Sequence, residues 1–188
     1  MTKIAIFASG SGTNAENIIN YFDSSDDIKV ALVLSNREDA KVHERAKKLG
    51  VPSFAFTNAE FREGTNILAT LATYEIGFIA LAGFMALISP ALLQAYDHKI
   101  INIHPSLLPK YGGKGMFGRH VHEAVLAAGE HESGITIHYV NERYDEGEII
   151  FQALTPISPN DNVKTLEHKI HNLEYNYYPL IIKKLVSQ

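Results

Sequence analysis

Residues 3–14 read KIAIFASGSGTN, and this stretch decides the fold. Its first six residues are almost continuously apolar, as expected for a strand that is buried on both faces of a sheet. The next segment, SGSGTN, supplies the glycines of a tight turn, and a helical pattern follows from Asn14 to Tyr21. A strand, a glycine-rich turn and a helix in this order are typical of the first unit of an α/β fold.

The same alternation continues along the chain. Apolar segments that predict further strands cover residues 29–34, 53–56, 76–81 and 99–104. Helical patterns cover residues 43–49, 61–74, 90–96 and 119–128. Strands that are joined through helices pair in parallel, and right-handed crossovers wind the helices onto both faces of the sheet. These segments therefore predict a doubly wound, mostly parallel α/β sheet.

The C-terminal part follows a different pattern. Residues 134–140 and 148–154 predict two strands without a helix between them, so we expect an antiparallel hairpin at one edge of the sheet. Asp161 or Asn162 then caps a last helix, which we expect to break near Pro179. We find no repeat or linker, and the length favours a single domain over residues 1–188.

Composition excludes several classes of protein. Hydrophobic residues make up 46% of the chain and charged residues 20%, which is a globular balance, and the net charge of −4 argues against a general nucleic-acid binder. The absence of cysteine excludes a thiol nucleophile and a thiolate metal site. Residues 76–94 carry no charge, but Gly77 and Gly83 interrupt them and Ser89-Pro90 begins a helix, so we predict a buried strand, a loop and a helix instead of a membrane span. The N-terminus lacks the layout of a signal peptide, so a cytoplasmic protein is expected.

The segment SGSGTN follows a strand, at the edge where open α/β sheets bind ligands. Glycines let the backbone approach a ligand, and free N–H groups at a helix start favour a phosphate, so we favour a monophosphate site. The spacing Gly10-x-Gly12-x-x-Ala15 also fits a loose dinucleotide fingerprint. However, Ser35-Asn36-Arg37 after the second strand offers no carboxylate for a ribose, and only Arg37 suits a 2′-phosphate. A plain tight turn is the third interpretation.

The strongest catalytic pattern is Asn102-Ile103-His104 at the end of a strand. Residues two apart on a strand point to the same side, so Asn102 and His104 project together. An amide donor and an imidazole can hold a developing oxyanion and move a proton. The alternative is a polar strand end that is bonded to the backbone. Asp145, in the turn of the predicted hairpin, is either an ordinary turn residue or a carboxylate that raises the pKa of His104, if the fold brings the two together.

Two further features bear on ligands. Phe84, Met85, Leu87 and Ile88 form an apolar loop that either lines a pocket for a flat ring or belongs to the core. The histidines do not form a ligand set at metal-binding spacing, so we expect no metal site.

Five motifs occur in one order: SGSGTN, LAGFMALISP, INIHPSLLPKY, the turn Asp145-x-Gly147 and the terminal Glu174-x-x-x-Tyr178-Pro179-Leu180. Together they resemble the phosphoribosylglycinamide formyltransferase family, folate-dependent enzymes of purine biosynthesis, over nearly the whole chain. The resemblance implies transfer of a formyl group from 10-formyltetrahydrofolate to the amine of 5′-phosphoribosylglycinamide. It implies small-molecule partners, this ribonucleotide and reduced folate, and neither a nucleic acid nor a membrane.

The resemblance also implies residue roles. The catalytic group is Asn102, His104 and Asp145. The ribonucleotide contacts Gly12, Thr13, Asn14 and Glu174. Folate contacts Met85, Ala86, Leu87, Ile88, Asn102 and the loop at residues 140–145, with Arg62 near its glutamate tail. The sequence departs from the family pattern twice: Ala86 stands where the family often has arginine, and the loop at residues 112–120 is longer than in some relatives.

Three alternatives accompany this interpretation. Methionyl-tRNA formyltransferase normally needs a further RNA-binding domain, which we do not expect because this acidic chain ends before one begins. Formyltetrahydrofolate hydrolase uses the same trio with water as acceptor and usually carries an added N-terminal domain, whereas Met1 is two residues from the first strand. A non-catalytic folate- or nucleotide-binding module is the third alternative, and the intact set of Asn102, His104 and Asp145 argues against it.

Overall fold

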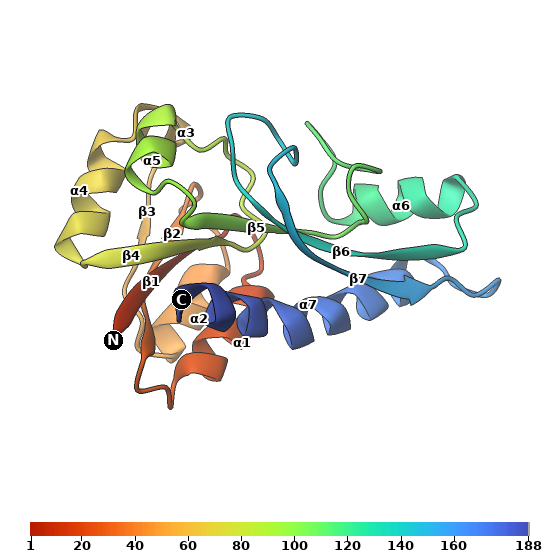
Figure 1. Ribbon diagram of the computed structural model, residues 1–188, viewed down its shortest axis with the longest axis horizontal. Coiled ribbons are helices and arrows are strands. Elements are labelled where there is room, and N and C mark those ends of the chain that lie inside the picture. The colour runs from red at the N-terminus through yellow and green to blue at the C-terminus, as the bar shows by residue number, and fades with distance from the viewer. Residues whose placement is uncertain (188) are drawn as a thin grey trace.

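The computed structural model describes residues 1–187, and one sheet of seven strands runs through them (Figure 1). The strands are β1 (Thr2–Phe7), β2 (Ile28–Ser35), β3 (Ser53–Ala55), β4 (Ile76–Leu81), β5 (Ile100–His104), β6 (Glu132–Tyr139) and β7 (Ile149–Pro156). Their order in the sheet is β3-β2-β1-β4-β5-β6-β7. The first five strands pair in parallel, and β6 and β7 extend one edge in antiparallel pairing. The prediction of a mostly parallel sheet with an antiparallel hairpin at one edge is confirmed.

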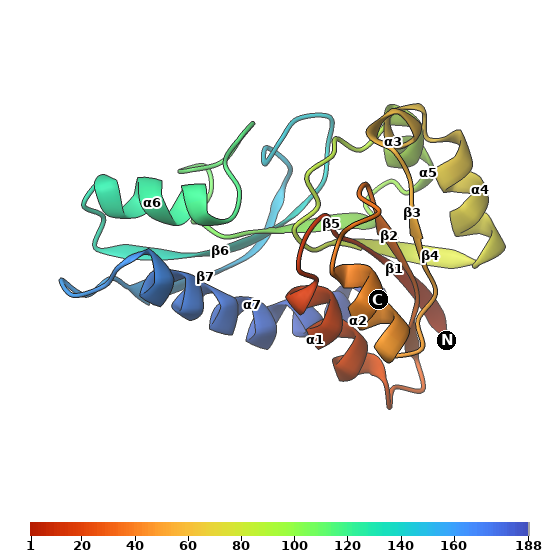
Figure 2. The same ribbon diagram turned by 180° about the vertical axis from the view of Figure 1, so that it is seen from behind.

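Helices cover both faces of this sheet (Figures 1 and 2). One core cluster contains buried residues of α1 (Thr13–Phe22), α2 (Val42–Lys48), α6 (Arg119–Ala127) and α7 (Val163–Val186). The other contains buried residues of α3 (Asn58–Glu63), α4 (Thr65–Thr73) and α5 (Pro90–Ala95). Along β1, Ile4 and Ile6 enter the first cluster, whereas Ala5 and Phe7 enter the second. Both faces of β1 are therefore covered, which explains its continuous apolar sequence and confirms the doubly wound arrangement.

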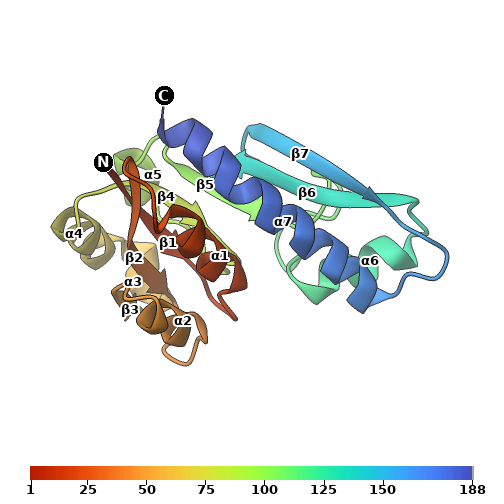
Figure 3. The same ribbon diagram turned by 90° about the horizontal axis from the view of Figure 1, so that it is seen from below.

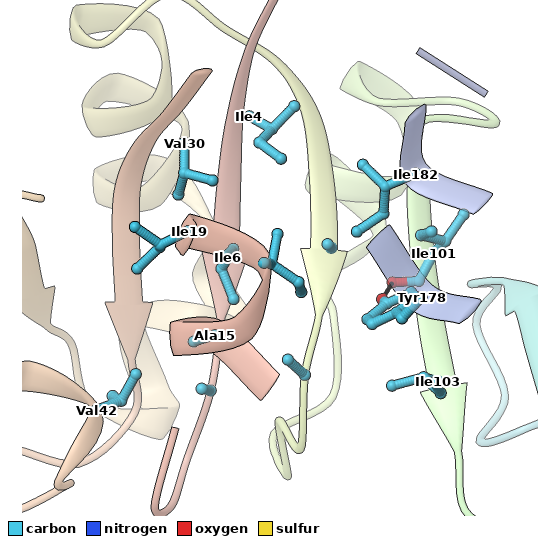
Figure 4. Packing of buried hydrophobic residues seen from close by; sticks show 14 of the residues in the cluster. Ile4, Ile6, Ala15, Ile19, Val30, Val42, Ile101, Ile103, Tyr178 and Ile182 are labelled. Carbon is cyan, nitrogen blue, oxygen red and sulfur yellow. Dashed lines mark hydrogen bonds between the residues drawn. The ribbon is translucent and has the colours of Figure 1, made fainter. Parts of the chain in front are cut away.

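The long helix α7 crosses the sheet (Figure 3) and is fixed to it by Tyr178. This side chain is fully buried and lies with Ile182 against Ile101 and Ile103 of β5 (Figure 4). Its hydroxyl lies 2.8 Å from the carbonyl oxygen of Leu81 and 3.3 Å from that of Ile101, and donates to them. The buried phenol thus ties the helix to two neighbouring strands, β4 and β5.

The predicted break of the last helix near Pro179 is wrong. α7 runs without interruption from Val163 to Val186, and Asn162 is its N-cap, as predicted. Proline has no N–H to donate to the carbonyl oxygen four residues earlier, which belongs to Tyr175. The side-chain amide of Asn17, in α1, donates to that oxygen at 3.0 Å instead. The helix continues because a second helix supplies the missing donor.

The single helix predicted for residues 61–74 is two helices. α3 begins at Asn58 behind a capping box that Thr57 and Glu60 form, and α4 begins after Gly64. Gly64 has φ 85°, and a Cβ at this position would lie 2.5 Å from the hydroxyl oxygen of Ser89. The left-handed glycine and this close approach divide the segment. The other predicted strands and helices are confirmed, with ends that differ by a few residues.

Residues 76–94 form β4, a loop and α5, as predicted. Ser89 caps α5 and accepts a hydrogen bond from the Leu92 N–H at 3.2 Å. Within residues 1–187, no helix is long and apolar enough to cross a membrane. The organisation of residues 1–188 as a single domain stays a prediction.

The contact that Tyr178 makes with β4 and β5 predicts a measurable loss of stability. Tyr178→Phe removes the hydroxyl and leaves the buried carbonyl oxygens of Leu81 and Ile101 short of a donor, so we expect the free energy of unfolding to fall by about 1–3 kcal/mol. Urea denaturation measures it. The control is Tyr21→Phe, at an exposed position of α1, which should change little. Equal stability of the two variants would contradict the role given to the Tyr178 hydroxyl.

Candidate active site

A cavity of about 580 Å³ opens where β1, β4 and β5 end. This is the edge at which open α/β sheets bind ligands. The predicted site residues that line it are Gly12, Thr13, Asn14, Met85, Ala86, Leu87, Ile88, Asn102, His104, Asp145 and Glu174. Arg62 is exposed on α3 and is not among the lining residues. The fold therefore brings together every predicted site residue except Arg62.

The glycine-rich loop presents the start of α1 to one end of the cavity. Gly12 has φ 73°, and α1 begins directly after it without a side-chain cap, so N–H groups of its first turn remain available to an anion. A Cβ at Gly12 would lie 2.6 Å from Cβ of Val42, so the packing of α2 also requires glycine there. The loop is joined to the apolar loop by Ser9, whose hydroxyl accepts from the Met85 N–H at 2.8 Å and donates to Asn36.

The dinucleotide interpretation gains no support from the region after β2. Arg37, which we considered for a 2′-phosphate, forms two hydrogen bonds with Asp39, at 3.0 and 2.8 Å. It does not line the cavity. Arg37 therefore supplies no anion subsite beside the uncapped start of α1.

The predicted catalytic side chains converge from two parts of the sheet. Asn102 and His104 project from the end of β5, and Asp145 comes from the loop between β6 and β7, where its backbone is left-handed (φ 58°). One carboxylate oxygen of Asp145 lies 3.4 Å from Nδ1 of His104, and the other lies 3.5 Å from the Asn102 amide nitrogen. The Gly113 N–H also donates to this carboxylate, at 2.9 Å. A Cβ at Gly147 would overlap the carbonyl oxygen of Tyr139, so the turn that presents Asp145 needs glycine.

Burial decides the electrostatics of His104. The imidazole is buried, and its Nε2 lies 2.7 Å from the carbonyl oxygen of Tyr111. Desolvation lowers the pKa of His104 below its ordinary value, although the negative charge of Asp145 and the bond to Tyr111 act to raise it; His138 acts to lower it. The expectation that Asp145 leaves His104 with a raised pKa is therefore wrong, because the cost of burying the imidazolium exceeds the attraction of one carboxylate.

Asp145 itself is held in its charged form. Burial acts to raise the pKa of this carboxyl group, but the net shift is downward. The neighbouring imidazoles of His138 and His104 and the hydrogen bond from the Gly113 N–H together outweigh desolvation. A carboxylate is thus available next to the imidazole.

His138 completes the polar cluster, and the sequence analysis missed it. It lies on β6 directly opposite Asn102 in the antiparallel register. Its Nδ1 lies 2.8 Å from the carbonyl oxygen of Tyr139, so that nitrogen carries the hydrogen. Its Nε2 then accepts from the Asn102 amide at 3.2 Å and lies 3.7 Å from Asp145. The sequence carried no direct signal for His138, because the long connection through α6 leaves the register of β5 and β6 open.

The opposite end of the cavity holds a buried carboxyl group. Glu174, on α7, is 6% exposed and accepts from the Asn14 amide at 2.9 Å. Burial raises the pKa of Glu174 to about 7. The side-chain amide oxygen (Oδ1) of Asn14 is buried and has no hydrogen-bond donor within the described part of the chain. An acceptor of this kind, beside uncapped N–H groups, fits a ligand that offers both an anion and hydroxyl groups.

Other residues that the sequence analysis did not select also line this end. His122, on α6, is buried with its Nδ1 unpartnered by any residue of the range 1–187. His171 lies one helical turn before Glu174 on α7, with its Nε2 4.0 Å from that carboxyl group. Because His171 and Glu174 are three residues apart on one helix, they share a face, and this spacing could have indicated His171 from the sequence. In the described range, no group of three or more histidine, aspartate or glutamate side chains is arranged to hold a metal ion.

The apolar loop differs in character from the rest of the cavity wall. Met85 and Leu87 are 45% and 44% exposed, whereas Ile88 is buried and belongs to the core. Both of the interpretations given for this loop are therefore met in part, by different residues. The longer loop at residues 112–120 contributes its residues 113–118 to the cavity wall, before α6 begins.

Comparison with known proteins agrees with this architecture. The chain matches the formyl transferase family over residues 2–182. It is 43% identical to the phosphoribosylglycinamide formyltransferase of Bacillus subtilis (strain 168), over 100% of this chain and 96% of that protein. The crystal structure of phosphoribosylglycinamide formyltransferase from Bacillus halodurans matches with a TM-score of 0.90 and 39% identity, over 100% of this chain and 96% of that chain. For glycinamide ribonucleotide transformylase 1 from Geobacillus kaustophilus the values are 0.89 and 41%, over 99% of both chains.

Fold and site thus define an α/β enzyme that transfers a small chemical group at the carboxyl edge of its sheet. The chain belongs to the formyl transferase family, as its motifs predict.

Burial of Glu174 predicts a pH-dependent stability. The pKa of this carboxyl group is raised from 4.5 to about 7 on folding, so between these values the unfolded chain binds fewer protons and the free energy of unfolding falls as pH rises. Glu174→Gln removes this dependence. From pH 4.5 to about 7, the free energy of unfolding of the variant minus that of the unmodified protein should therefore increase by up to about 3 kcal/mol. Urea denaturation at pH 4.5 and 8 measures it, with the exposed Glu142→Gln as control. A difference that does not vary with pH would rule out a buried ionisation at Glu174.

The pair of Asp145 and His104 predicts a shift in titration. Asp145→Asn removes the charge that acts to raise the pKa of His104, so this pKa should fall further and the acidic limb of turnover, where His104 is protonated and cannot accept a proton, should move to lower pH. An NMR titration of His104 in both proteins, beside turnover against pH, measures the shift. If the two titrations coincide, Asp145 is a turn residue without electrostatic influence on His104.

Proposed function

We propose that this protein transfers the formyl group of 10-formyltetrahydrofolate to the amine of 5′-phosphoribosylglycinamide. The observation that carries the proposal is the convergence of Asn102, His104 and Asp145 in one cavity, between an anion-binding helix start and an apolar loop. Membership of the formyl transferase family supports it, because the reaction needs a donor of formyl groups. The relatives' names supply the acceptor substrate.

The acceptor substrate fits the end of the cavity at α1. Its phosphate group would accept from the free N–H groups of Thr13 and Asn14, and Gly12 leaves room for it. Its ribose hydroxyls would contact Glu174 and donate to the unpartnered side-chain amide oxygen of Asn14. In this pose the amine of the substrate points along the cavity toward His104.

The folate donor fits the other end. Its flat ring would lie against Met85, Ala86 and Leu87 and the backbone of residues 140–145, with Ile88 behind them. Where the family often has arginine, this chain has Ala86. The backbone of the loop can still contact folate, but the contact that an arginine side chain would make is lost. Arg62, exposed on α3 outside the cavity wall, would contact the glutamate tail where it leaves the cavity.

The residues of the site would divide the chemistry among them. As the amine nitrogen forms a bond with the formyl carbon, negative charge develops on the formyl oxygen, and the Asn102 amide donates to that oxygen. His138 fixes the orientation of this amide. The pair of His104 and Asp145 takes a proton from the attacking nitrogen and returns it to the folate nitrogen, whose bond to the formyl carbon breaks. No covalent intermediate with the protein is required.

Two other functions differ from this one in the acceptor. A formyltetrahydrofolate hydrolase would use Asn102, His104 and Asp145 to transfer the formyl group to water. A binding module would transfer it neither to water nor to the ribonucleotide. The anion site at α1 favours the ribonucleotide over water, because water needs no phosphate-binding loop. We also propose that residues 1–188 act as a single domain.

The test is formyl transfer by the purified protein with and without the ribonucleotide. We expect tetrahydrofolate to form at the rate of the N-formyl product, and only when the ribonucleotide is present. Release of formate without the ribonucleotide would identify a hydrolase instead. Binding of both ligands without turnover would identify a binding module.

Asn102→Ala probes the oxyanion directly. Removal of one such donor typically costs about 10²–10³-fold in kcat, and we expect a loss in this range with substrate affinity less affected. The matched control is Asn66→Ala, at an exposed position of α4. A kcat within the error of the unmodified protein would exclude Asn102 from the reaction.

A further inference from the structure

His104 owes its orientation to a backbone group as well as to Asp145. Its Nε2 lies 2.7 Å from the carbonyl oxygen of Tyr111, and a carbonyl can only accept, so the hydrogen is on Nε2. Nδ1 then faces the carboxylate of Asp145 at 3.4 Å. In the neutral imidazole Nδ1 therefore carries no hydrogen and is the nitrogen that can take up a proton beside Asp145, and the position of Tyr111 sets this choice.

The segment at residues 110–113 contacts both members of this pair. Tyr111 accepts from His104, and two residues later the Gly113 N–H donates to Asp145 at 2.9 Å. Gly112 lies between them, and a Cβ there would come within 3.2 Å of Cβ of Asp145. A movement of this short segment would therefore release the imidazole and the carboxylate together.

Tyr111 has an unfavourable backbone conformation. Its φ is 56°, in the left-handed region that residues with a side chain rarely adopt. Such a conformation persists when the surrounding structure holds it, and it occurs often at functional sites. At Tyr111, contacts of its side chain hold this left-handed conformation.

Glu130 supplies those contacts from outside the cavity. It lies between α6 and β6, and its carboxylate accepts from the Tyr111 hydroxyl at 2.9 Å. The same carboxylate accepts from the Lys110 ammonium group at 2.9 and 3.2 Å. The Ser106 hydroxyl, which donates to the Lys110 carbonyl oxygen at 2.7 Å, fixes the inner side. Neither Glu130 nor Tyr111 lines the cavity.

From this chain of contacts we infer that Glu130 is a positioning residue for His104: it holds the Tyr111 side chain, and through it the carbonyl oxygen that fixes the imidazole. The inference rests on the proposed function, in which His104 manages the proton. It assigns a role in the reaction to a partly exposed glutamate that touches neither substrate.

The test compares Tyr111→Phe, Glu130→Ala and Glu130→Gln. The first two break the bond between the hydroxyl and the carboxylate, whereas Gln keeps an acceptor oxygen for the hydroxyl and should restore most of the activity. We expect Tyr111→Phe and Glu130→Ala each to lower kcat by about tenfold, less than the ~10²-fold that a 1 Å misplacement can cost. Both KM values should stay near those of the unmodified protein. The double variant should lose no more than either single variant, because both act through one bond.

If Glu130 only stabilised the fold, its removal would leave the pKa of His104 unchanged. The NMR titration of His104 therefore distinguishes a positioning role from a structural one. Two other titratable groups act on this imidazole, Asp145 from the loop after β6 and His138 from β6, and His104 in turn acts on His122 of α6. The carbonyl of Tyr111 acts to raise the pKa of His104. Loosening that contact should therefore move the NMR titration of His104, and the acidic limb of kcat, to lower pH in Tyr111→Phe and Glu130→Ala. Glu123→Ala, which breaks an ion pair with Arg119 on α6, is the control and should move neither.

The outcomes separate the inference from the proposed function. Absence of formyl transfer by the unmodified protein contradicts the function, while the titration of His104 still tests the inference. A His104 pKa that is unchanged in Tyr111→Phe overturns the inference. A lower thermal stability with raised KM values, but with no shift in the pH profile of kcat, also overturns it. If Glu130→Ala does not fold, Tyr111→Phe and Glu130→Gln decide the question.

Discussion

The withdrawal of His104 and Asp145 from water is the constraint on which the rest of the site depends. An imidazole that is buried loses the hydration of its charged form, and a single carboxylate does not restore it. The fold surrounds this pair with polar groups from several segments. They are the side chains of Asn102 on β5 and His138 on β6, and backbone groups of Tyr111 and Gly113. The antiparallel strands β6 and β7 are what make this possible, since His138 and the loop that carries Asp145 both belong to them.

The two ends of the cavity then differ in chemistry because they are built from different elements. The start of α1 and the buried carboxyl group of Glu174 suit a ligand with an anion and hydroxyl groups. The loop after β4 leaves Met85 and Leu87 partly exposed in the cavity wall, so it offers apolar surface to a ligand. The hydrogen bond from the Met85 N–H to the Ser9 hydroxyl joins these two walls directly.

Much of this arrangement could be predicted from the sequence, because local pattern controls it. The buried strands are continuously apolar, Ser89-Pro90 starts a helix, and Asn102 and His104 project together by the period of a strand. What the sequence did not reveal depends on contacts between distant residues. His138 became visible only with the register of β5 and β6, and Gly64 divides a helix because Ser89 packs against it. The direction of the His104 pKa was mistaken because a sequence displays a possible charge partner but not the depth of burial.

The hydrogen bond from Asn17 to the carbonyl oxygen of Tyr175 has a consequence for how the molecule becomes ordered. Beside Pro179, α7 lacks one donor of its own, so this helix is complete only when α1 is already against it. The amide that completes it comes from the helix that begins at the glycine-rich loop, and Glu174 directly precedes the carbonyl that receives it. The last secondary-structure element of the chain therefore takes one of its hydrogen bonds from one of the first, and the same contact between α1 and α7 holds the glycine-preceded start of α1 beside the buried carboxyl group of Glu174.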